Sequence, residues 1–184
     1  MLEVLLLYLI IPGRINFLQL GRYGRFGEQR YRQQFGRRFD WLSFNAGLAA
    51  SHTGNRVAIA FDPSYISKSG KCTPYMGRFW SGCTKMAKRG LEISGIGLLD
   101  MDLHTCFHLE AVQTPPTKTL EQVKYTLIDW YLHVLRTRKE TLQRLTNYVV
   151  ADAYFSKSAF VDGALKMGFH VISRFRDVAY FRYL

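Results

Sequence analysis

The chain contains a short apolar run, Asn55-Arg-Val-Ala-Ile-Ala-Phe61, which Asp62 and Pro63 follow directly. Such a run predicts a buried central strand. A second run of the same character, Tyr148-Val-Val-Ala151, is followed by Asp152. Because a helical segment lies between them, the two strands can pair in parallel. Both aspartates would then emerge at the carboxyl edge of one sheet, which is where open α/β sheets bind ligands.

The segments around these two runs predict an α/β fold, with helices packed on a mixed sheet in the order βββαβαβ. A polar turn at 100–102 makes a hairpin of the second and third strands. Thr119 and Gln122 are expected to cap the first helix, and Gly168 to end the second. Residues 63–91 are expected to form a long loop. The other expected elements are strands over 91–99, 106–113 and 169–173, and helices over 119–145 and 157–167.

Composition favours a folded, strongly basic protein. Hydrophobic residues make up 48% of the 184 positions, and 25 Lys and Arg against 14 Asp and Glu give a net charge of +11. Such a charge favours a polyanionic partner, either nucleic acid or an acidic membrane surface. The apolar stretch Leu2–Ile11 is too short to span a bilayer and lacks the features of a signal peptide. Three cysteines without zinc-like spacing indicate a reducing compartment, so we expect a cytoplasmic protein.

The region before the first strand is basic and rich in glycine and aromatic residues. Residues 14–52 include seven Arg, and the glycines of the run 21–27 fall at every third position. A phosphate-binding P-loop is disfavoured, because no Lys-Ser/Thr pair follows and no strand precedes. We therefore divide the chain into a basic, partly helical segment over 1–52 and a core domain over 53–184. The basic segment either contacts DNA or packs on the core.

Asp62 and Asp152 are candidate metal ligands. Neighbouring strands lie roughly 4.8 Å apart, so carboxylates at adjacent strand ends can share a pair of divalent cations. Ligands that offer only oxygen favour Mg²⁺ or Mn²⁺ over zinc. The simpler alternative is that each aspartate is a turn or capping residue.

The region 63–91 is a candidate DNA-binding surface. It carries no acidic residue, and its basic residues alternate with aromatic ones, a combination that suits phosphate contacts and base stacking. A solvated surface is the alternative. The candidates are Lys68, Lys71, Arg78, Trp80, Lys85, Lys88 and Arg89, with Lys157 and Arg174 near the same predicted sheet edge.

A second candidate metal site lies on one predicted strand. His104, Cys106, His108 and Glu110 alternate, so they would share a face of a regular strand. Residues along a single strand seldom converge on one ion without a ligand from elsewhere. A structural role for these four is therefore the favoured interpretation.

Several separate blocks of the chain resemble the DDE-superfamily transposases of bacterial insertion sequences. The similarity extends over nearly the whole chain. The blocks are Ala60-Phe-Asp-Pro-Ser-Tyr-Ile-Ser-Lys-Ser-Gly70, Gly77-Arg-Phe-Trp-Ser-Gly82, Arg89-Gly-Leu-Glu-Ile93, Phe107-His-Leu-Glu-Ala-Val-Gln-Thr114 and Val150-Ala-Asp-Ala-Tyr-Phe-Ser-Lys157.

This resemblance implies a ribonuclease H-like fold and metal-dependent cleavage and transfer of DNA strands at transposon ends. It implies that Asp62 and Asp152 are the first two catalytic acids and that Mg²⁺ or Mn²⁺ is the cofactor. A bacterial, nucleoid-associated protein is expected, whose intact form can be a homodimer. The third acid of the family, a Glu on a later helix, has no counterpart after Asp152. We therefore expect a chain truncated before that acid, which is inactive alone. The alternative is a DNA-binding remnant or a truncated regulator of transposition.

Overall fold

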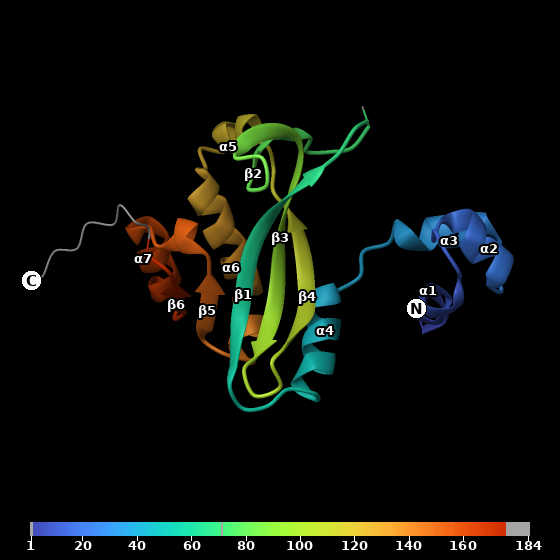
Figure 1. The fold of residues 1–184 in the computed structure, drawn as a ribbon, viewed down its shortest axis with the longest axis horizontal. Helices are drawn as coiled ribbons and strands as arrows, with labels where there is room; N and C mark the ends of the chain where they lie inside the picture. Colours follow the sequence, from blue (N-terminus) through green and yellow to red (C-terminus); the bar gives the residue numbers. More distant parts are fainter. Residues whose placement is uncertain (1, 71, 176–184) are drawn as a thin grey trace, which may run out of the picture. The chain divides into compact units, whose positions relative to one another are not determined.

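The computed structural model describes residues 2–70 and 72–175, which form two compact units dividing between Asp40 and Trp41 (Figure 1). The sequence predicts this boundary after residue 52. The difference is the helix α4 (Trp41–Ala50), which belongs to the second unit. Its Asn45 side chain donates a hydrogen bond to the carbonyl of Leu109 in that unit, at 2.8 Å.

The first unit consists of short helices around a small apolar core. Its helices are α1 (Leu2–Ile10), α2 (Phe17–Tyr23) and α3 (Glu28–Phe35). Leu7, Leu20 and Tyr31 are buried between them. Glu3 ties the helices together, because its carboxylate accepts hydrogen bonds from the Tyr31 hydroxyl and the Arg25 amide, both at 2.8 Å. These bonds lower the pKa of Glu3.

The second unit is built on a mixed sheet of six strands, as the sequence predicts for the fold class. The strand order is β2-β3-β1-β5-β6, with β4 also paired to β3. The three pairings among β1 to β4 are antiparallel, whereas β1 with β5 and β5 with β6 are parallel. The strands are β1 (Val57–Ser67), β2 (Gly77–Ser81), β3 (Met86–Asp100), β4 (Thr105–Gln113), β5 (Tyr148–Ala151) and β6 (His170–Ser173).

The prediction of a long loop over 63–91 is wrong. Strand β1 does not stop at Asp62 but continues to Ser67, and it pairs with β3 along its whole length. The same region also supplies β2 and the first part of β3, which form a hairpin. Pro63 is tolerated inside β1 because β5 pairs with that strand only as far as Phe61, which leaves an open edge beyond it.

The prediction of a single helix over 119–145 is also wrong. The chain forms α5 (Thr117–Gln122) and α6 (Leu127–Gln143), separated by a turn in which Lys124 has a positive φ of 56°. The capping box lies at the start of α6, where Thr126 and Asp129 bond each other's backbone amides, and not at Thr119.

After β5 the chain makes a 3-10 turn, η1 (Ala153–Phe155), and then α7 (Ser158–Lys166). Gly168 follows with a φ of +86°, the left-handed conformation expected of a residue that ends a helix.

Helices cover one face of the sheet and leave the other exposed. The buried core joins α4, α6 and α7 to inward-facing residues of the strands, including Ile59 and Phe61 of β1. The alternate residues of β1, Asp62, Ser64 and Ile66, are exposed. We call these the helix-covered face and the open face.

The predicted hairpin of β3 and β4 is confirmed, and two aspartates stabilise its turn. Asp100 accepts hydrogen bonds from the amides of Gly54 and Leu103, and these bonds lower its pKa. Asp102 accepts hydrogen bonds from the amide and guanidinium of Arg56, which lower its pKa in the same way. Both carboxylates therefore fasten the start of β1 to the end of β3.

Candidate functional site

Asp62 and Asp152 occupy neighbouring backbone positions at the carboxyl end of β5. In the parallel pairing of β1 with β5, Phe61 lies opposite Ala151, and each aspartate is the next residue along its chain. Neighbouring strands are about 4.8 Å apart. The predicted adjacency of the two strands is therefore present in the fold.

The two carboxylates line different hollows of the surface. Asp62 is exposed on the open face, where it accepts a hydrogen bond from the Ser64 hydroxyl at 3.2 Å. It lines a shallow groove with Gly95, Gly97 and His108. Asp152 begins the 3-10 turn, accepting a hydrogen bond from the Tyr154 amide at 2.9 Å, and lines a deeper cleft.

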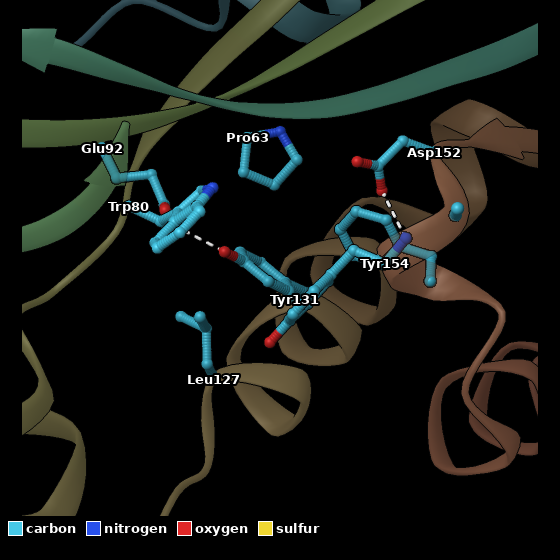
Figure 2. A pocket seen from close by; sticks show the side chains of 9 residues that line it. Pro63, Trp80, Glu92, Leu127, Tyr131, Asp152 and Tyr154 are labelled. Atoms are coloured by element: carbon cyan, nitrogen blue, oxygen red, sulfur yellow. Dashed lines mark hydrogen bonds between the residues drawn. The ribbon is translucent and has the colours of Figure 1, made fainter. Parts of the chain in front are cut away.

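The cleft beside Asp152 opens between the sheet and α6 and has a volume of about 650 Å³. Figure 2 shows Glu92 and Trp80 at one end, Asp152 and Tyr154 at the other, and Tyr131 between them. Its lining therefore combines two carboxylates with four aromatic rings. The lining residues are Pro63, Trp80, Glu92, Leu127, Tyr131, Asp152, Ala153, Tyr154 and Phe155.

Glu92 and Tyr131 form a buried polar pair in this cleft. The Tyr131 hydroxyl donates a hydrogen bond to the Glu92 carboxylate at 2.7 Å, and only 7% of Glu92 is exposed. In the described part of the chain, no Lys or Arg forms a salt bridge with Glu92. Burial and the nearby Glu92 charge raise the pKa of Tyr131, so its hydroxyl stays protonated.

Sequence reasoning missed Glu92 as a site residue. The segment Arg89–Ile93 resembles a family, and a lone acid within the apolar pattern of a strand is itself unusual. That pattern was the signal available. Only the packing of α6 on β3 shows that the carboxylate meets Tyr131.

Asp62 and Asp152 have the ligand type that a divalent metal ion needs, but the set of ligands is incomplete. Asp62 and Asp152 offer oxygen atoms, as Mg²⁺ and Mn²⁺ prefer. Among residues 2–70 and 72–175, however, no group of three or more His, Cys, Asp or Glu side chains is placed to hold an ion. We therefore derive no catalytic step through a metal ion.

The predicted DNA-binding residues of 63–91 gather on the hairpin of β2 and β3 and beside it. Arg78 and Arg89 lie directly opposite each other in this pairing, and both are exposed. Like charges at such positions repel, and a bound anion would relieve the repulsion. Lys68 follows β1, Lys85 lies in the turn between β2 and β3, and Lys88 lies on β3. Lys71 lies outside the described residues.

The two weaker candidates are placed apart. Lys157 precedes α7, and its ammonium lies 4.0 Å from the centre of the Tyr154 ring, a cation–π contact. It therefore lies beside the cleft. Arg174 is exposed just after β6.

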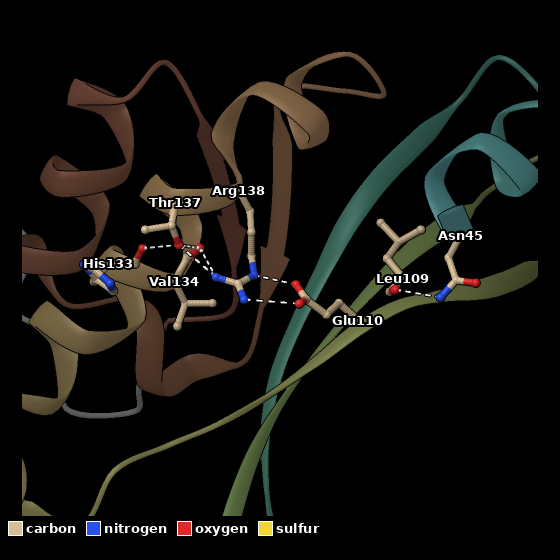
Figure 3. Close-up of polar contacts among 7 residues, drawn as sticks. All are labelled: Asn45, Leu109, Glu110, His133, Val134, Thr137 and Arg138. Atoms are coloured by element: carbon tan, nitrogen blue, oxygen red, sulfur yellow. Dashed lines mark hydrogen bonds and ion pairs between the residues drawn. The ribbon is translucent and has the colours of Figure 1, made fainter. Parts of the chain in front are cut away.

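The alternating set on β4 does not form a metal site. His104 lies in the turn before the strand, and a register shift of β3 between Ile96 and Gly97 separates the pairing positions of His108 and Glu110. Figure 3 shows Glu110 turned toward α6, where Arg138 binds its carboxylate through two nitrogens. A salt bridge already occupies this acid, as the favoured structural interpretation expects.

Comparison with known proteins gives little more. No known protein family and no curated protein matches the chain in sequence. Among solved structures, it is similar to a chain described as "Crystal structure of the Mos1 mariner paired end complex with Mn", with a TM-score of 0.33 and 13% identity. The alignment covers 92% of this chain and 56% of that one. No helix in the described residues is long and apolar enough to cross a membrane.

Proposed function

We propose that this chain is part of a DDE-type DNA transposase and that Asp62 and Asp152 are two of its metal-binding carboxylates. The observation that carries the proposal is the parallel register of β1 and β5, which puts both aspartates one residue beyond the paired positions Phe61 and Ala151. The blocks of resemblance to insertion-sequence transposases support it, and so does the net charge of +11. A ribonuclease H-like order of elements belongs to the same proposal.

In this proposal Asp62 and Asp152, which line different hollows here, would each offer carboxylate oxygens to Mg²⁺ or Mn²⁺. The ion would supply positive charge at the phosphate that is cleaved. The chain's own residues bind and orient the DNA. The cross-strand pair of Arg78 and Arg89 provides adjacent guanidinium groups for the phosphate backbone. Lys85, in the turn of the hairpin, extends this positive surface, whereas Lys88 lies on the opposite face of β3 from Arg89.

A nicking assay tests the proposal. Mn²⁺-dependent nicking of supercoiled plasmid DNA by the chain would support the proposal, and Asp62→Asn or Asp152→Asn should then reduce the rate by about 100-fold or more, the scale on which loss of one charge-stabilising group acts. Asparagine at 152 can still accept the Tyr154 amide bond, so the turn is preserved. The matched control is Asp162→Asn, an exposed change on α7 that leaves the rate unchanged.

Nicking that persists in both variants would refute the assignment of these aspartates. Nicking by the Asp162 variant at a reduced rate would show that the assay reports general damage and not the site.

A second candidate function is DNA binding without catalysis, as a remnant or a regulator of transposition. The absence of a cluster of three ligands among the described residues favours it. It predicts salt-sensitive DNA binding with no Mn²⁺-dependent nicking, and loss of affinity in Arg78→Ala/Arg89→Ala but not in Asp62→Asn.

A further inference from the structure

We infer that the cleft between β3, α6 and the 3-10 turn η1 binds one unpaired nucleobase that carries an exocyclic amino group. The base would stack on Trp80 and donate a hydrogen bond to Glu92. This inference rests on the proposed function, because both require DNA as the ligand. The cleft's aromatic and acidic lining carries the argument.

Trp80 provides the stacking surface. It is 62% exposed although it lines the cleft, so more than half of its surface is available to a ligand. Stacking on an exposed ring is the usual way in which proteins hold unpaired bases. At about 650 Å³ the cleft falls within the range of small-molecule sites, and it has room for a base.

The charges of the lining select a base over a phosphate. Glu92 and Asp152 are acidic, and the described lining contains no Lys or Arg, so without a metal ion a phosphate group would be repelled. Amino groups of cytosine, adenine and guanine are donors that a carboxylate accepts, whereas thymine has no amino group. Because the Tyr131 hydroxyl bonds one oxygen of Glu92, the carboxylate is held in place for this contact.

The basic hairpin beside the cleft completes the arrangement. Trp80 lies on β2 between Arg78 and the turn that carries Lys85, and Lys157 stands over Tyr154 at the far end. The strand's phosphates would therefore follow the basic rim while one base enters the acidic, aromatic cleft. This separation of the two contacts is what distinguishes base capture from general DNA binding.

Equilibrium binding of fluorescent oligonucleotides in EDTA tests the inference without any cleavage. Short single strands of dC should bind about tenfold more tightly than strands of dT of equal length, the effect of one hydrogen bond to a charged acceptor. Trp80→Ala should weaken both by about tenfold, as loss of a base-stacking ring does. Trp80→Phe, which keeps a ring, should lose less. The matched control is Tyr148→Ala, an exposed ring at the other end of β5, which should change neither.

The double variant Glu92→Leu/Tyr131→Phe tests the hydrogen bond. It removes both members of a buried pair together, which leaves no partner unsatisfied. It should bind dC and dT equally, whereas Tyr131→Phe alone, which keeps the carboxylate, should keep the preference. Thermal melting followed by circular dichroism verifies that each variant is folded.

Equal binding of dC and dT by the unaltered chain, or a preference that survives in the double variant, would overturn the inference. Unchanged affinity in Trp80→Ala would overturn it as well. Loss of nicking with the dC preference intact counts against the proposed catalysis alone, and nicking without a preference counts against the cleft alone.

Discussion

The two faces of the sheet differ although they share the same strands. On the helix-covered face, Ile59 and Phe61 lie in the core, and the cleft with Asp152 opens beyond them. On the open face, Asp62 and Ser64 are exposed above a groove lined with small residues such as Gly95. The two-residue period of β1 thus separates buried from exposed side chains, because adjacent residues of one strand contribute to opposite faces.

The difference between the two faces predicts a large loss of unfolding free energy when a side chain on the helix-covered face is truncated. Phe61→Ala should lower the free energy of unfolding by about 3–5 kcal/mol, the usual cost of removing a buried aromatic ring. Phe61 is 1% exposed and contacts the rings of Tyr131 and Phe155. Urea denaturation measures the change.

The matched control lies on the open face of the same strand. Ile66→Ala should change the free energy of unfolding by no more than about 0.5 kcal/mol, because 43% of Ile66 is exposed. Similar costs for Phe61→Ala and Ile66→Ala would show that both faces are covered in solution and would end the comparison.

A smaller effect is expected for the buried polar pair. Tyr131→Phe keeps the ring that packs on Phe61 but leaves the Glu92 carboxylate without its hydroxyl donor, which should cost about 1–3 kcal/mol. Tyr148→Phe removes an exposed hydroxyl from β5 and should cost almost nothing. If the two variants unfold at the same urea concentration, the pair contributes no stability to the helix-covered face.

The smallest expected effect concerns access of a reagent to the Cys106 thiol on the open face, with no change in stability. Cys106 lines the groove of the open face and is exposed. In a Cys72→Ser/Cys83→Ser chain, its thiol should react with a chromogenic disulfide reagent within about threefold of the rate for a thiol in an unfolded peptide. Slow labelling that becomes fast in denaturant would mean that something covers this face.

The sequence predicted the central part of the fold because that part depends on local patterns. The runs 55–61 and 148–151 are apolar, end in aspartate and are separated by helical periodicity, which is enough to indicate a parallel pair. The β2–β3 hairpin was missed because Pro74, Gly77 and Gly82 are typical of loops, and long-range pairing overrides that local signal. The break between α5 and α6 depends on Lys124 in a conformation that no propensity indicates.

The candidate site was predicted in part for the same reason. Adjacent strand ends follow from topology, so the neighbouring positions of Asp62 and Asp152 could be anticipated. The direction of each side chain could not, because it depends on β1 continuing past Asp62 while β5 stops at Ala151. The Glu92–Tyr131 contact joins residues 39 positions apart in sequence, and only tertiary packing brings them together.

Pro63 has a consequence for how this domain behaves among its own copies. Beyond Phe61 the β1 strand has a free edge, and a free edge is a template onto which a strand of another molecule can add. A proline offers no N–H for such an addition, so this stretch is protected from sheet-to-sheet aggregation. Pro63 thereby lets the β1 edge next to the aspartates stay exposed to solvent without pairing with a strand of another molecule.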